Sequence, residues 1–266
     1  LQPASHSAIN GGMTSQPIFT DPDQIADGLP VKEILPQLRA LMAEEPTPQR
    51  PASAIVVAPP GAGKTTSIPP VLAASTWRGE SGRIIMLEPR RLAARAAAQR
   101  IAALMGEEVG GFVGYRTRID SAVSARTRIE VLTEGLFLRR LLGDPMLEDV
   151  ACVILDEVHE RSLEADLALA FCLDLQRTLR PDLRLVAMSA TAETERLAKL
   201  MNAPVLTSEG RMFALDVRHA KKDIPTLRDI APATAAGIRL ALAETQGDIL
   251  AFLPGTGEIR RTAQLL

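Results

Sequence analysis

The feature that most constrains this chain is a glycine-rich turn between an apolar run and a predicted helix. Residues 54–57 read as a buried strand, and the turn that follows is Ala58-Pro59-Pro60-Gly61-Ala62-Gly63-Lys64-Thr65. A strand, a loop of this kind and a helix, in that order, are typical of a phosphate-binding loop. The turn therefore predicts an α/β fold with a nucleotide at the carboxyl ends of its strands.

The side chains of this loop are those that a nucleotide and its Mg²⁺ require. Gly61 and Gly63 let the backbone curl so that successive N–H groups point at phosphate oxygens. Lys64 would reach the β- and γ-phosphates, and the Thr65 hydroxyl would bind Mg²⁺. The strict pattern has glycine at its first position, where this chain has Ala58, so an ordinary glycine–proline turn stays an alternative. The expected nucleotide contacts are Gly61, Ala62, Gly63, Lys64, Thr65 and Thr66.

A second apolar run ends in two adjacent acids. Residues 150–155 are continuously apolar, which is typical of a strand covered on both faces, and Asp156 and Glu157 follow at its carboxyl end. Because ligands of parallel sheets lie at that edge, we assign Asp156 to the Mg²⁺ shell and Glu157 to the attacking water. An isolated Asp-Glu pair is otherwise often a solvated turn.

Apolar runs recur along the chain with helical stretches between them. They cover residues 54–58, 83–87, 128–132, 150–155 and 184–188. This alternation predicts a parallel sheet flanked by helices. Val31 to Met42 have helical spacing that Pro36 interrupts, and Pro69 and Pro70 should shorten or kink the helix after the loop. Residues 211–217 and 249–253 look like the opening strands of a second, similar domain.

At this point the chain resembles a known family. The run Asp156-Glu157-Val158-His159-Glu160-Arg161-Ser162 resembles motif II of the DEAH/RNA-helicase group of superfamily 2, with valine in place of the usual alanine. Other runs follow in that family's order: residues 88–95 resemble motif Ia, 133–135 motif Ib, 189–191 motif III and 249–255 motif IV. The sequence of residues 88–92 and the run Ser208-Glu209-Gly210-Arg211 are most similar to those of the bacterial HrpB-type helicases.

The resemblance covers roughly residues 29–266 and implies RecA-like domains of the P-loop NTPase class. It divides the chain into a disordered N-terminal tail (1–28), a first RecA-like domain that binds ATP (29–207), and a linker with the start of a truncated second RecA-like domain (208–266). Alanine at the head of the loop is ordinary in this superfamily, which removes the earlier mismatch.

The resemblance also assigns residues outside the phosphate loop. His159, counted among the catalytic groups with Lys64, Asp156 and Glu157, would relay the nucleotide state to Ser189 or Thr191. Arg100 would stack on adenine. Taken alone, His159 reads as a satisfied loop histidine, and Ser189 and Thr191 as caps of the next helix. The residues expected to contact a single-stranded nucleic acid, which the family suggests is RNA, are Arg90, Arg91, Arg118 and Thr133.

Composition limits the possible partners. The net charge is −2, so nucleic-acid binding requires a local basic patch. Residues 83–140 contain eleven arginines, no lysine and six acids, a local excess of five positive charges, although arginine outnumbers lysine throughout the chain. Aromatic residues make up only 3%, which disfavours base-stacking platforms. Two cysteines and three scattered histidines predict no disulfide and no zinc site, and no apolar run predicts a membrane span, so we expect a cytoplasmic protein.

These patterns predict an ATP-dependent RNA helicase that couples Mg²⁺-ATP hydrolysis to movement along a single strand and to duplex unwinding. The arginine-bearing motif VI of the family would lie beyond Leu266, and such an arginine contributes orders of magnitude in rate. We therefore expect this chain to bind nucleotide weakly, to hydrolyse it poorly and to unwind nothing. A P-loop kinase and a nucleic-acid-binding switch without unwinding are the alternatives.

Overall fold

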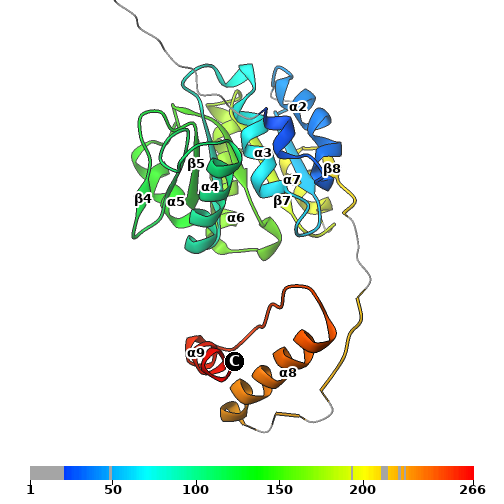
Figure 1. Ribbon diagram of the computed structural model, residues 1–266. Helices are drawn as coiled ribbons and strands as arrows, with labels where there is room; N and C mark the ends of the chain where they lie inside the picture. The colour runs from blue at the N-terminus through cyan, green and yellow to red at the C-terminus, as the bar shows by residue number, and fades with distance from the viewer. Residues whose placement is uncertain (1–20, 48–49, 193, 211–214, 221–222, 225) are drawn as a thin grey trace, which may run out of the picture. The chain divides into compact units, whose positions relative to one another are not determined.

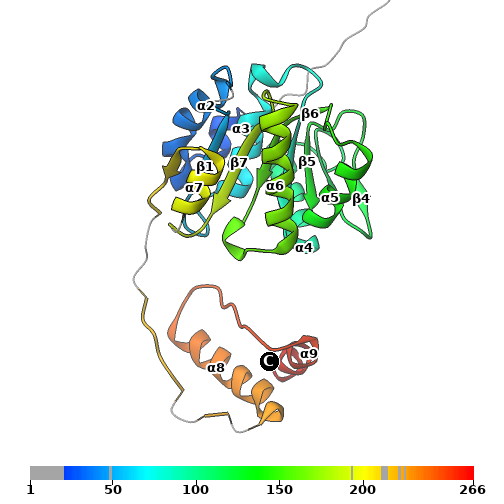
Figure 2. The same cartoon turned by 180° about the vertical axis from the view of Figure 1, so that it is seen from behind.

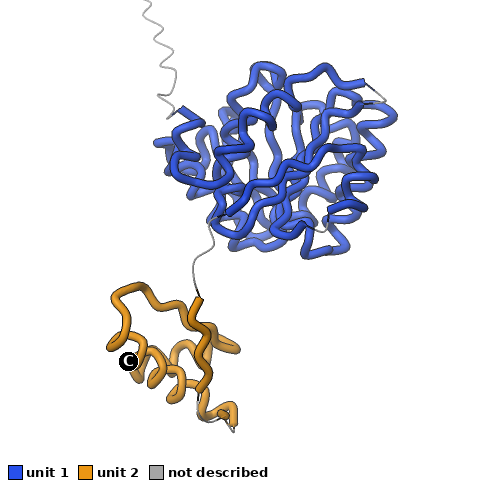
Figure 3. Tube along the Cα trace, turned by 90° about the vertical axis from the view of Figure 1, so that its right-hand side faces the viewer, with its two compact units in different colours: residues 1–212 blue, residues 213–266 orange. Residues whose placement is uncertain are grey.

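The computed structural model describes residues 21–47, 50–192, 194–210, 215–220, 223–224 and 226–266. The chain forms two compact units, Leu1–Met212 and Phe213–Leu266, which are coloured separately in Figure 3. Each unit is described by itself. The first contains the whole of the predicted sheet, and the second contains two packed helices.

The first unit is built on a mostly parallel sheet with the strand order β4-β3-β5-β2-β6-β7-β1-β8. Only β4 runs antiparallel to its neighbour, β3. The five predicted strands are confirmed to within one residue at either end, as β1, β2, β5, β6 and β7. The bounds are β1 Ser53–Val57, β2 Arg83–Glu88, β3 Val113–Arg116, β4 Ser121–Ala122, β5 Ile129–Thr133, β6 Val150–Leu155, β7 Arg184–Ser189 and β8 Val205–Thr207.

Helices cover both faces of this sheet, because alternate side chains of each buried strand point to opposite faces. In β1, Ala54 and Val56 join one core, whereas Ile55 and Val57 join the other. The first core is covered by α1 Pro22–Ile25, η1 Pro30–Ile34, α2 Leu35–Ala43, α3 Lys64–Ala73 and α4 Arg91–Leu104 (Figure 1). The second core is covered by α5 Glu134–Gly143, α6 Leu163–Thr178 and α7 Glu195–Met201 (Figure 2). The short turns η2 Thr76–Arg78 and η3 Val158–Glu160 connect strands and helices.

The N-terminal segment differs from the prediction. Residues 1–20 lie outside the described residues, but residues 21–28 are not a disordered tail. Asp21 caps α1 by accepting a hydrogen bond from the backbone N–H of Asp23 at 3.0 Å, and Ile25 and Ala26 are buried in the first core. The physical reason is that this short apolar pair finds a place against α3, which the local composition did not reveal.

The prolines of two helices behave differently from each other. Pro36 lies in the first turn of α2, where its missing N–H has no intrahelical partner to lose. The predicted helix over 31–42 is therefore divided into η1 and α2. Pro69 and Pro70 do not end α3, which runs through both to Ala73. Both are buried, so packing in the first core offsets their lost hydrogen bonds.

The second unit contains η4 Leu227–Asp229, α8 Ile230–Glu244 and α9 Thr256–Leu265. The strands expected here are wrong where they can be seen: residues 249–253 and 215–217 are not in strands, and residues 211–214 lie outside the described residues. Leu250 and Phe252 are 80% and 88% exposed. A strand needs a neighbour for its backbone hydrogen bonds, and no described residue of this unit supplies one.

Candidate nucleotide site and the adjacent arginine edge

The carboxyl ends of β1, β6 and β7 are neighbours in the sheet, because the order places β7 between β6 and β1. The glycine-rich loop, the acidic pair and the Ser-Ala-Thr run therefore meet at one edge. The Thr65 hydroxyl donates a hydrogen bond to Asp156 Oδ2 at 2.6 Å, although the two residues are 91 positions apart in the sequence. The two predicted half-sites are thus brought into direct contact.

The loop has the backbone that a phosphate cradle requires. Gly61 and Gly63 have φ values of 78° and 92°, which side-chain-bearing residues rarely adopt. A Cβ on Gly63 would also lie 2.6 Å from Leu29 Cδ1. Helix α3 begins at Lys64, so the N–H groups of its first turn are available to an anion at this end of the helix.

Lys64 is folded back over its own loop. Its ammonium donates hydrogen bonds to the carbonyl of Ala58 and, at 3.4 Å, to that of Pro59. Burial lowers the pKa of this ammonium, and the nearby charges of Glu157 and Asp156 oppose that shift. A buried cation beside two acids is suited to receive the negative charge of a phosphate group.

Asp156 is buried and already hydrogen bonded. Besides Thr65, its Oδ1 accepts the backbone N–H of Glu157 at 2.9 Å. Burial raises its pKa, and these hydrogen bonds oppose the shift. A carboxylate and a threonine hydroxyl in contact are oxygen groups of the kind that would hold a Mg²⁺ ion.

Sequence reasoning missed Glu88, which lies at the carboxyl end of β2 and is only 4% exposed. Burial first, and then the adjacent Asp156 carboxylate, raise its pKa to about 9. The signal was present in the sequence: Glu88 ends β2 as Asp156 follows β6, and these two strands pair in parallel with Leu87 opposite Leu155. What the sequence lacked was the strand order that makes β2 and β6 neighbours.

Glu157 has a strained backbone and an unsatisfied side chain. Its φ of 51° lies in the left-handed region, which costs a non-glycine residue on the order of 1 kcal/mol or more. Its Oε2 atom is buried and has no hydrogen-bond partner among the described residues. Burial and the charge of Asp156 raise its pKa. A buried carboxylate oxygen without a partner marks a place where a further polar group fits.

His159 connects the acidic pair to the end of β7. Its Nδ1 accepts the backbone N–H of Ala190 at 3.3 Å and lies 3.3 Å from Glu157 Oε2. Glu157 Oε2 lies near this ring nitrogen without a hydrogen bond from it. His159 thus bonds to the backbone between Ser189 and Thr191, and its relay to one of their side chains stays a prediction. Those two residues bond to each other, with the Thr191 N–H donating to Ser189 Oγ at 3.1 Å.

Comparison with known proteins agrees with this geometry. Residues 37–200 match the family model described as DEAD/DEAH box helicase. The chain belongs to this family. It is 47% identical over 239 residues to the ATP-dependent RNA helicase HrpB of Escherichia coli, covering 90% of this chain and 28% of that protein. It is 35% identical to the ATP-dependent RNA helicase HrpA homolog of Haemophilus influenzae, covering 92% of this chain and 18% of that protein.

Solved structures give the same relationship. A crystal structure of the Escherichia coli DEAH/RHA helicase HrpB aligns with a TM-score of 0.75 at 46% identity, covering 90% of this chain and 29% of that chain. The predicted fold class is confirmed: the sheet and its flanking helices form a RecA-like helicase fold. The chain spans less than a third of the length of these relatives.

The rest of the carboxyl edge of this helicase domain carries arginines, after strands β2 and β3. Arg91 and Arg118 are exposed and have no hydrogen bond or ion pair within the described residues, and the same holds for Arg100 on α4. Arg90 instead bonds to Glu160. Thr133 precedes α5 at the end of β5 and is half-buried. We call the stretch of edge formed by Arg90, Arg91, Arg118 and Thr133 the arginine edge.

Most of the arginines that give residues 83–140 their predicted excess of positive charge have partners inside the helicase domain. Seven of the eleven arginines have partners within the described residues: Arg83, Arg90, Arg95, Arg116, Arg126, Arg128 and Arg140. Three of them, Arg83, Arg116 and Arg140, surround the fully buried Glu130. The charge count therefore overstated the basic patch, because it could not show which arginines bind acids.

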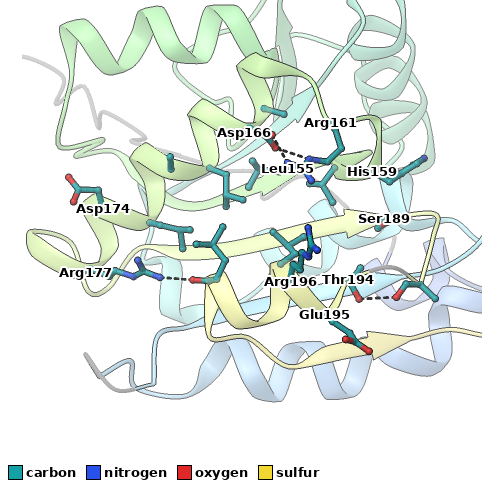
Figure 4. Close-up of a pocket in the computed structure, with 18 residues that line it drawn as sticks. Leu155, His159, Arg161, Asp166, Asp174, Arg177, Ser189, Thr194, Glu195 and Arg196 are labelled. Carbon is teal, nitrogen blue, oxygen red and sulfur yellow. Dashed lines mark hydrogen bonds and ion pairs between the residues drawn. The ribbon is translucent and has the colours of Figure 1, made fainter.

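A separate groove of the first unit lies elsewhere. It occupies about 1230 Å³ between α6 and α7, and it includes none of the phosphate-loop residues. Figure 4 shows His159 and Ser189 among its lining residues, with Arg161 bound to Asp166 at 2.8 Å. Its lining combines leucines with charged side chains, among them Arg161, Arg177 and Arg196. Within the described residues, no cluster of three His, Cys, Asp or Glu side chains suits a metal, and no helix is long and apolar enough to cross a bilayer.

Proposed function

We propose that this chain is the ATP-binding part of an ATP-dependent RNA helicase, in which hydrolysis drives movement along single-stranded RNA and separation of duplexes. The observation that carries the proposal is the contact between Thr65 and Asp156, with the unsatisfied Glu157 oxygen beside it. Together these groups form an edge suited to a nucleoside triphosphate. The helicase names of the curated relatives support the reaction class.

Each residue of the site has a role in this proposal. The loop from Gly61 to Thr66 would bind the phosphates through its backbone N–H groups, and Lys64 would leave its loop carbonyls to neutralise the γ-phosphate. Arg100 would stack on adenine from α4. Glu157 would hold and orient the attacking water. Its Oε2 atom, which has no hydrogen-bond partner among the described residues, is suited to bind that water, and its raised pKa is suited to accept a proton from it. His159 would report the state of Glu157 to the backbone of Ala190.

The residues present also fit Mg²⁺. Thr65 and Asp156 offer a hydroxyl and a carboxylate already in contact, which are the oxygen ligands that this ion prefers alongside phosphate and water. When bound, the ion would neutralise charge on the phosphates.

The arginine edge would contact the nucleic acid. Arg91 and Arg118 are exposed arginines at the carboxyl edge of the sheet with no partner in the described part of the chain. A phosphate backbone could bind them there without regard to base sequence. We place the first RecA-like domain up to residue 207 and treat 208–266 as a linker and the start of a second domain. Because an arginine from a later motif would be required for fast hydrolysis, we expect slow turnover and no unwinding by this chain.

Paired substitutions test these roles. Lys64→Ala should weaken binding of a fluorescent ATP analogue at least tenfold, because it removes the charge that faces the phosphates. Glu157→Gln should leave binding within about twofold but slow hydrolysis measured in single turnovers with oligouridylate. The matched controls are Lys199→Ala and Glu164→Gln, which change exposed residues on α7 and α6. Equal loss of binding in both site variants would overturn the assignment.

The alternative is a nucleic-acid-binding switch that binds ATP without hydrolysis. No observation favours it over the proposal, since a switch has no need of the Glu157 oxygen beside the phosphates. Hydrolysis by the wild-type chain that Glu157→Gln abolishes would exclude the switch. Binding of both ligands with no hydrolysis in single turnovers would favour it.

A further inference from the structure

We propose that Glu160 competes with a nucleic-acid phosphate for Arg90, so that nucleic acid on the arginine edge releases the loop that carries Asp156 and Glu157. The inference rests on the proposed function and names a positioning residue for it. Arg90 would then have two partners in turn: a carboxylate in the free protein and a phosphate in the bound one.

The pair joins the two halves of the sheet edge. Arg90 follows β2 and Glu160 belongs to the turn η3 after β6, and these two strands are neighbours. The Arg90 guanidinium lies 2.8 Å from Glu160 Oε1. The backbone N–H of Glu160 donates to the carbonyl of Glu157 at 2.9 Å. Glu160 is therefore tied through its side chain to the arginine edge and through its backbone to the predicted water-orienting residue.

The loop around Glu160 is held more firmly on one side. Glu157 and Arg161, on either side of η3, both have left-handed backbones, with φ values of 51° and 54°. Beyond them, Ser162 caps α6 by accepting the N–H of Ala165 at 2.9 Å, and its hydroxyl donates to Glu134. Because the following helix fixes that end, a shift of Glu160 is taken up toward Glu157.

The pair lies beside other acids and is accessible to a competing phosphate. Glu88, Glu134 and Glu157 have raised pKa values, mainly through burial, and the charge of Glu160 adds to each shift. Arg90 is the cation that binds Glu160 beside this group. Its side chain is 72% exposed, so a phosphate can reach it, and the arginine fork binds phosphate as it binds carboxylate.

The expected effect is modest and measurable. An exposed ion pair contributes about 1.5- to 5-fold in an equilibrium constant. Glu160→Gln should therefore tighten binding of a labelled oligouridylate by about that factor, because the phosphate no longer competes with a carboxylate. In the wild-type chain, oligouridylate should change the affinity for a Mg²⁺-bound, non-hydrolysable ATP analogue. The analogue should change the affinity for oligouridylate by an equal factor, because coupling between two sites is reciprocal. In Glu160→Gln that factor should move toward one.

The experiment compares the wild-type chain, Glu160→Gln and Asp166→Asn by fluorescence anisotropy at fixed salt, with and without the ATP analogue. Asp166→Asn is a matched control, because Asp166 binds Arg161 at the same 2.8 Å distance and that arginine is also 72% exposed. Both variants remove one negative charge from an exposed ion pair, Glu160 in η3 and Asp166 in the first turn of α6. Tighter binding and reduced coupling in Glu160→Gln alone would support the proposal.

The other outcomes separate the inference from the proposed function. If the wild-type chain binds oligouridylate and Glu160→Gln matches it in both affinity and coupling, the competition is refuted while the proposed function stands. If Asp166→Asn behaves as Glu160→Gln does, the effect is one of general charge and the competition is again refuted. If the wild-type chain binds no oligouridylate with or without the analogue, the proposed function fails and the inference with it.

Discussion

Replacing Glu130 by glutamine should destabilise the first unit more than any single change at its surface. Glu130 lies in β5, is fully buried and receives three arginines. Arg83 is 3.1 Å away and Arg140 is 3.4 Å away, both at Oε2, and Arg116 is 2.5 Å away at Oε1. Glutamine keeps the shape but removes the charge, and its amide N–H groups would face guanidinium donors.

The magnitude follows from burial and from the remaining partners. Removing one member of a buried ion pair costs about 3–5 kcal/mol, since the other charge loses its compensation. Arg83 and Arg140 keep Asp149, which lies 3.2 Å from Arg83. Arg116 loses its acid but its side chain is 47% exposed. We therefore expect the lower end, about 3 kcal/mol. Arg116→Gln, which removes a half-exposed partner, should cost about 1 kcal/mol or less.

Urea unfolding followed by tryptophan fluorescence measures this effect. Trp77 is the single tryptophan of the chain and stacks on Arg184 at 4.2 Å within the first unit, so its signal reports that unit. With a slope of about 2 kcal/mol per molar urea, a loss of about 3 kcal/mol lowers the midpoint by about 1.5 M. A midpoint shift for Glu130→Gln no larger than that for Arg116→Gln would refute the reasoning.

Two further predictions concern the nucleotide edge. The pKa of Glu88 is raised to about 9 in the folded chain, so its contribution to stability is complete below its unfolded value, about 4.5, and is lost as the pH rises toward 9. In EDTA, Glu88→Gln should therefore unfold at a urea midpoint that depends less on pH between about 5 and 9; an unchanged pH profile would contradict the proton on Glu88. A Cβ on Gly210 would lie 2.1 Å from Pro59 Cγ, so Gly210→Ala should weaken binding of an ATP analogue several-fold by displacing the loop. Gly143→Ala, which has open space around its Cβ, is its control, and equal affinities in the two variants would count against this contact.

The strands that could be predicted are those buried on both faces. Apolar residues dominate five strands: β1, β2, β5, β6 and β7. Because the phosphate loop and the acidic pair each follow one of these strands, the sequence predicted both at one edge of the sheet. β3, β4 and β8 are two to four residues long and contain glycine, arginine, serine or threonine, so no apolar run marks them. The apolar residues near 250 led to a wrong strand prediction, because they have the composition of a strand but no neighbouring strand among the described residues.

The site was predictable in its residues and less so in their partners. Thr65 and Asp156 meet as expected, since both follow parallel strands of one sheet. Glu88 was missed because its neighbour in space depends on strand order, which the sequence does not state. His159 bonds to the backbone of Ala190 where a side chain was expected. Side-chain identity predicts the chemistry available, but a backbone N–H is present at every position and leaves no mark in the sequence.

The strand order has a consequence for genetics. The nucleotide residues follow β1, β6 and β7, and the arginines follow β2 and β3, so the two groups adjoin only where β2 lies beside β6. Substitutions at that seam, at Glu88, Arg90 or Glu160, should alter nucleotide binding and nucleic-acid binding together. Separation-of-function alleles should instead map to its flanks, at Lys64 on one side and Arg118 on the other.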